Sequence, residues 1–110
     1  MSDIRQARKA LVERILEGDG KASRALRRAA FDNFGLADTL RTLIDKVATQ
    51  AYRITDKDVA AVRAMGIGED QIFEMVVCAA IGQAMRQFDT ALVALETASG
   101  RSEHATRDPR

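Results

Sequence analysis

The 110-residue sequence contains one Cys, one His, one Pro and no Trp. A single Cys cannot form an internal disulfide, and one Cys with one distant His cannot supply the ligands of a zinc site. No apolar run reaches the roughly 18 residues of a membrane span. Basic residues such as Arg5 and Arg8 are followed by Glu13 instead of the apolar core of a secretory signal. We therefore expect a cytoplasmic protein with no membrane partner, metal or cofactor.

Strand-forming signals are also scarce. The only Pro is Pro109, so no Pro interrupts the helical patterns, and β-branched runs are absent. Ala, Leu, Arg, Glu and Gln, all good helix formers, are abundant. The sequence therefore predicts an all-α, single-domain helical bundle of about five helices. The formal net charge is +1, so the overall field does not favour a nucleic-acid partner.

Glycine-containing turns separate most of the apolar periodic segments. Helices are predicted over residues 3–17, 22–34, 38–52, 55–65 and 69–95. In the second of them Phe34 is expected to face inward. Thr55 with Asp58 resembles a capping box, and Gly66 suits the left-handed end of a helix. From Ser99 the chain is polar, so we expect a helical domain over residues 1–98 and a flexible polar tail over residues 99–110.

The segment 69–95 is apolar around most of its helical circumference. One row has a spacing of four residues, and a second row adjoins it: Ile72, Val76, Ala80, Ala84, Phe88 and Leu92, then Phe73, Val77, Ile81 and Met85. This pattern exceeds the stripe of a surface helix and predicts a long buried C-terminal helix, covered by its own chain or by a partner. Gly82 predicts a close helix approach, either within the chain or between subunits.

Glu74 and Asp58 are the candidate acid–base residues. Glu74 lies beside Phe73 where the apolar face begins, and burial there would raise its pKa. The alternative is an acid that interacts only with the helix dipole. Tyr52 and Arg53, just before the Thr55 cap, are candidates for substrate binding at a pocket mouth, or else form an ordinary helix end.

Three further features have simpler structural explanations. The densest basic patch comprises Lys21, Arg24, Arg27 and Arg28. It lacks interleaved aromatic residues, so a solvated helix face is favoured over a phosphate or nucleic-acid site. Cys78 has apolar neighbours and no second Cys, which favours a buried structural thiol over a reactive one. The only His, His104, lies in the polar tail, where a catalytic role is not expected.

The run from Ile54 to Ala80 (ITDKDVAAVRAMGIGEDQIFEMVVCAA) resembles the core of the carboxymuconolactone decarboxylase and alkylhydroperoxidase D-like proteins. In those proteins a helix ends in Gly, an acidic start follows, and an Ala-rich helix continues. The likeness covers roughly residues 40–95. It implies an all-helical fold and a homo-oligomer such as a dimer, trimer or hexamer.

The resemblance does not extend to the redox chemistry of the family. Peroxidase members carry Cys-x-x-Cys and a His on the helix before the Gly turn, with a Glu upstream. Those positions correspond here to Ala51, Ile54, Asp58 and Thr39, and none of them matches. The dithiol mechanism, which needs an attacking and a resolving thiol, is therefore not expected.

Three functions are compatible with these observations, and the least favoured is a nucleic-acid binder that uses Lys21, Arg24, Arg27 and Arg28. The first is an oligomeric, non-redox helical domain that binds a small molecule or a protein partner. The alternative is an acid–base enzyme of the decarboxylase or lactone type that acts on a small carbonyl substrate, with Glu74 and Asp58 as catalytic residues and Tyr52 or Arg53 as substrate-binding residues.

Overall fold

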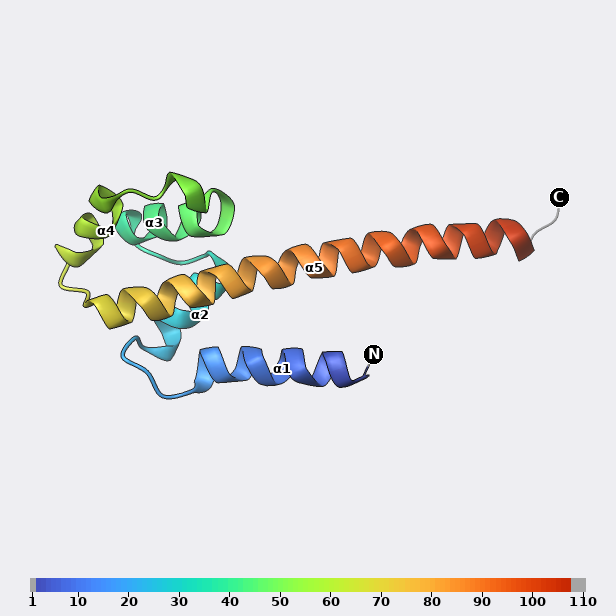
Figure 1. The fold of residues 1–110 in the computed structure, drawn as a ribbon, viewed down its shortest axis with the longest axis horizontal. Helices are drawn as coiled ribbons and strands as arrows, with labels where there is room; N and C mark the ends of the chain where they lie inside the picture. The colour runs from blue at the N-terminus through green and yellow to red at the C-terminus, as the bar shows by residue number, and fades with distance from the viewer. Residues whose placement is uncertain (1, 108–110) are drawn as a thin grey trace.

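The computed structural model describes residues 2–107, and the side chains of residues 3–99. Five α-helices and one short 3-10 helix, η1, follow one another without a strand in this described part of the chain. Their bounds are α1 Ser2–Glu17, α2 Arg24–Asp32, α3 Asp38–Thr49, η1 Ala51–Arg53, α4 Asp56–Arg63 and α5 Glu69–Arg107. The predicted all-α domain of five helices is thereby confirmed (Figure 1).

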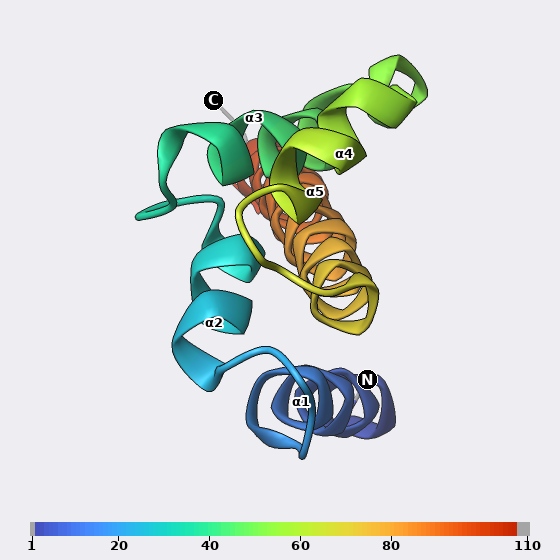
Figure 2. The same ribbon diagram turned by 90° about the vertical axis from the view of Figure 1, so that its left-hand side faces the viewer.

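The helix α5 is the axis of the fold. Figure 1 shows α3 and α4 on one side of it and α1 on the other, and Figure 2 shows α2 joining the two sides. The core is made of apolar side chains from all five helices, because each helix turns one face toward α5 or its neighbour. The most deeply buried of these residues are Ala30, Leu43, Ile44, Val62, Met75, Cys78 and Ala79.

The helix ends follow local hydrogen-bonding chemistry. The Thr55 side chain accepts from the Asp58 amide, and the Asp58 carboxylate accepts from the Thr55 amide, so the predicted capping box is present at the start of α4. Gly66 has a φ of 89°, the left-handed conformation predicted for it. Asn33 also adopts a left-handed conformation and ends α2 at Asp32. The prediction for Phe34 was wrong: it lies beyond this end and is exposed.

The helix α5 is longer and less buried than predicted. It runs to Arg107 instead of ending at Leu95. Its first half is packed, but Ala80, Ala84 and Phe88 are exposed although the apolar row predicted them to be covered. Ala80 and Ala84 are exposed because they lie on the side of α5 away from the buried Ala79 and Gly82, and Phe88 lies partly under the Arg8 guanidinium.

The region expected to be a polar tail is helical at its start. α5 passes through Ser99 without interruption. The side chains from Gly100 onward, His104 among them, lie outside the described side chains. The division of the chain at residue 98 and the flexibility of residues 99–110 stay predictions.

The helices α2 and α5 approach each other closely at Gly82. A Cβ placed on Gly82 would clash with the carbonyl oxygen of Phe31 and would lie 2.8 Å from its carbonyl carbon. Arg86, one turn further along α5, donates to the same carbonyl oxygen at 2.5 Å. Of the two contacts expected at Gly82, the structure contains the one within the chain.

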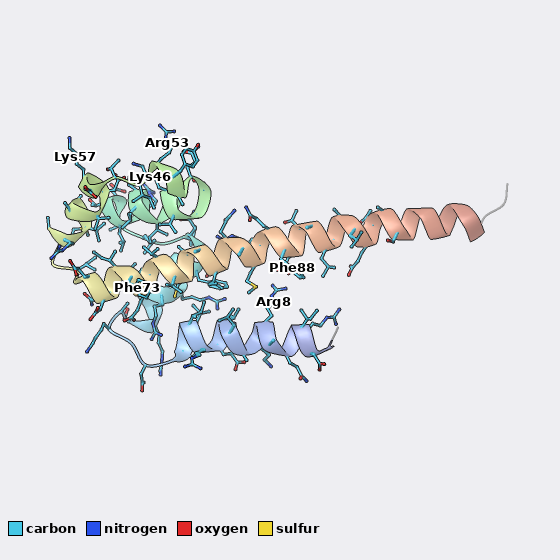
Figure 3. All side chains as sticks on the ribbon, in the orientation of Figure 1. Arg8, Lys46, Arg53, Lys57, Phe73 and Phe88 are labelled. Atoms are coloured by element: carbon cyan, nitrogen blue, oxygen red, sulfur yellow. The ribbon has the colours of Figure 1, made fainter. Side chains whose placement is uncertain are left out.

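A charged contact ties α1 to α5. The Arg8 guanidinium donates twice to the Asp89 carboxylate, at 2.6 and 2.7 Å, and also lies over the Phe88 ring. Figure 3 shows Arg8 between the two helices, beside Phe88. This bidentate contact holds the N-terminal half of α1 against α5.

The crossing at Gly82 leads to a stability prediction. Gly82→Ala adds a β-carbon where the Phe31 backbone leaves no room, so the free energy of unfolding should fall by about 1–3 kcal/mol despite the better helix propensity of Ala. Gln87→Ala, at an exposed position of the same helix, is the control and should change stability by less than about 0.5 kcal/mol. Equal stability of Gly82→Ala and the native chain in urea unfolding would contradict the proposed close packing.

Candidate functional site

Glu74 binds the connection between α1 and α2. Its carboxylate accepts from the backbone N–H of Lys21 at 2.8 Å and from that of Ala22 at 3.1 Å. The chain approaches so closely that a Cβ on Gly20 would meet the carboxylate carbon at 3.0 Å. The carboxylate thus satisfies two backbone donors that precede α2, and it holds that connection against α5.

The pKa of Glu74 is lowered, whereas burial was expected to raise it. Hydrogen bonds from the backbone of Lys21 and Ala22 stabilise the carboxylate and lower its pKa, and this effect outweighs the desolvation that would raise it. The predicted rise was wrong because the sequence did not show that two backbone donors meet this side chain. An ionised carboxylate that accepts two hydrogen bonds is poorly suited to donate a proton at neutral pH.

Asp58 is likewise engaged in structural contacts. Besides closing the capping box with Thr55, its carboxylate accepts from the Lys46 ammonium of α3 at 2.8 Å. The Lys46 hydrogen bond is the largest cause of its lowered pKa, and the Thr55 backbone adds to it. Asp58 therefore joins α4 to α3 as an ionised carboxylate.

The four predicted site residues are not gathered at one hollow. Glu74 lines a hollow between α1, α2 and α5, and neither Asp58 nor Tyr52 contributes to it. Arg53 lines a different hollow beside α3, where its guanidinium donates to the Gln50 side chain. Tyr52 is 85% exposed. In Figure 3 Arg53 lies above α3, far from the side of α5 where α1 lies. Their catalytic and binding roles stay predictions without a shared pocket to support them.

The basic patch on the second helix is divided by the fold. Arg27 is buried, Arg24 donates to the Glu17 carbonyl, and Arg28 pairs with Asp32. A nucleic-acid surface needs its cations together on one accessible face. The structure gives this patch no such face, because the 3.6-residue period turns Arg27 into the core.

Cys78 has the environment of a structural thiol. It is buried, and desolvation raises its pKa, which keeps the thiol protonated. Its Sγ lies 3.6 Å from the Ile15 carbonyl oxygen. Within the side chains that the structure describes, no three His, Cys, Asp or Glu residues are grouped as a metal site would require.

An exposed apolar stripe runs along α5. Its members have spacings of three and four residues, so they share one face of the helix. They are Phe73, Val77, Ala80, Ala84, Phe88, Ala91, Leu95 and Ala98. We call this set the α5 stripe. All are exposed except Val77, which is half-buried.

The α5 stripe lies opposite the face that packs against α2. Met75, Ala79 and Gly82, all buried, point to α2 and the core. The apolar spacing was visible in the sequence, but its exposure was not. The sequence showed only that α5 had more apolar surface than one side of packing requires.

Comparison of the chain with models of protein families, with curated proteins and with solved structures finds no match. In the part of the chain that the structure describes, no helix is both long and apolar enough to cross a membrane.

The Glu74 contacts predict a pH-dependent loss of stability. The folded-state pKa lies below the ordinary value of 4.5, so the carboxylate stabilises the fold above that pH and ceases to do so as the pH falls through its folded pKa. Glu74→Gln should lower the free energy of unfolding at neutral pH by about 1 kcal/mol. The difference between variant and native chain should shrink on acidification below pH 4.5.

Asp70→Asn is the matched control for this measurement. It removes a carboxylate from the first turn of the same helix, where it complements the dipole without a hydrogen bond like that of Glu74. Its effect in urea unfolding should be smaller than that of Glu74→Gln. A Glu74→Gln effect that is no larger than the control effect, or that does not change with pH, would show that the backbone contacts contribute nothing to stability.

Proposed function

We propose that the chain is a non-redox helical subunit of a homo-oligomer, and that α5 is the element through which two copies associate. The observation that carries this proposal is the α5 stripe. Phe73 is 68% exposed and Leu95 is 64% exposed, although both are large apolar side chains. A contiguous apolar face of this length on a monomer is typical of a surface that another protein covers.

The dimensions of the chain indicate that part of α5 is not packed against another helix. The radius of gyration is 18.3 Å, whereas a compact domain of this length has about 13 Å. The excess comes from the outer half of α5, which extends past the end of α1 (Figure 1). An isolated helical segment is only marginally stable in water, so packing against another helix would stabilise it.

A second copy of the same chain is the partner that the stripe fits best. Spacings of three and four residues give the seam of a left-handed helix pair. Four Ala residues of the stripe (Ala80, Ala84, Ala91 and Ala98) would let two helix backbones approach closely. A two-fold axis across the seam would make the contact self-complementary, which is the commonest arrangement in soluble oligomers.

The family resemblance accords with this function. We propose that the chain is a relative of the carboxymuconolactone decarboxylase and alkylhydroperoxidase D-like proteins that lacks the dithiol. The capped α4, the Gly66 turn and the long α5 support that relationship. Asp58 stands at the position of the family's redox His and serves instead as a helix cap and ion-pair partner. A binding role is therefore proposed in place of turnover.

Self-association through α5 predicts a concentration-dependent equilibrium that one substitution removes. Leu95→Glu would place a charge within the apolar helix contact, so self-association should weaken at least about tenfold. The measurement is sedimentation equilibrium at micromolar concentration. The helix content of the monomer should not change, because Leu95 is mostly exposed in the single chain.

Val93→Glu is the matched control. Val93 is 61% exposed, nearly the same as Leu95, but it lies on the opposite face of α5. This variant should self-associate like the native chain. A native chain that stays monomeric, or an equal loss of association in both variants, would overturn the proposed contact.

A further inference from the structure

A hollow of about 320 Å³ lies where α1, α2 and the beginning of α5 meet. Its wall is apolar over most of its length and carries a few charged groups. The lining residues are Leu11, Arg14, Ile15, Asp19, Arg27, Phe73, Glu74, Val77 and Cys78. This volume is near the lower end of the range for small-molecule sites, so any ligand that fits is small.

Arg27 is the unusual member of this wall. Arg27 is only 5% exposed, yet no carboxylate of the described residues lies within ion-pair distance of its guanidinium. A buried cation without a paired anion is costly, so such a group normally has a partner. The carboxylate of Glu74, an acid in the same wall, already accepts from Lys21 and Ala22, and attraction by the Arg27 charge adds to the lowering of its pKa that these hydrogen bonds cause.

One hydrogen bond compensates for part of the cost of burying Arg27. The Arg27 Nη1 donates at 3.1 Å to the Ile15 carbonyl oxygen, which belongs to the last turn of α1. Carbonyls there lack a partner within the helix and attract a cation, so Arg27 caps α1. The guanidinium has five N–H donors, and its buried Nε has no hydrogen-bond partner in the described structure.

We infer that this hollow binds a small organic monocarboxylate, whose carboxylate pairs with Arg27. A carboxylate matches the planar fork of a guanidinium and neutralises its buried charge. The apolar body of the ligand would lie against Leu11, Phe73 and Val77, two of which are more exposed than their size favours. The acids Asp19 and Glu74 at the wall exclude ligands with several negative charges. All lining residues come from one chain, but Phe73 and Val77 also belong to the α5 stripe, so ligand binding and self-association would share this part of α5.

The test uses benzoate and its neutral analogue benzamide as probes. Both have the same ring and nearly the same volume, but only benzoate offers a carboxylate to Arg27. We expect benzoate to shift the backbone amide resonances of Phe73, Val77 and Cys78 in two-dimensional NMR spectra. Benzamide should bind at least about tenfold more weakly, because it lacks the charge. Equal binding of the two probes, or no shift with benzoate at its highest soluble concentration, would overturn the inference.

Two variants assign the effect to Arg27. Arg27→Gln removes the cation and should weaken benzoate binding by about tenfold or more, with little effect on benzamide. Arg24→Gln, on the same helix and outside the hollow, is the control and should bind benzoate like the native chain. Undiminished benzoate binding in a folded Arg27→Gln variant would contradict the inference. If that variant does not fold, the ratio of benzoate to benzamide affinity in the native chain decides the question.

Discussion

The close crossing of α2 over α5 is the constraint on which the other contacts depend. Because Gly82 has no side chain, the Phe31 backbone lies directly on α5, and Arg86 binds the Phe31 carbonyl from the next turn. This crossing brings the rest of α2 onto the core face of α5, so Ala30 is completely buried. It also determines how far the α1–α2 connection lies from Glu74. A wider crossing would separate that carboxylate from the backbone donors it binds.

Three carboxylates in this protein join elements that are separate in the sequence. Glu74 holds the α1–α2 connection, Asp58 joins α4 to α3 through Lys46, and Asp89 joins α5 to α1 through Arg8. In each case the partner stabilises the ionised carboxylate and lowers its pKa. This use explains why acids that looked suitable for proton transfer in the sequence have the opposite electrostatic character in the fold.

Two features of the described residues carry the proposals, and they are of different kinds. The α5 stripe is an excess of apolar surface, which a second helix would cover. The buried Arg27 is an excess of charge, which an anion would neutralise. They meet at Phe73 and Val77, which belong both to the stripe and to the wall of the hollow. Assembly and ligand binding would therefore involve overlapping surfaces of α5.

The sequence by itself determined the helices and several of their ends. The apolar period located α5, and local chemistry placed the Thr55 cap and the Gly66 turn, because such signals depend on residues close in the chain. Only the tertiary structure decided that Glu74 meets the backbone of Lys21, that Arg27 turns inward, and that Phe88 stays 46% exposed beside Arg8. Those outcomes depend on which distant segments come together, and periodicity shows the presence of an apolar face without showing what covers it.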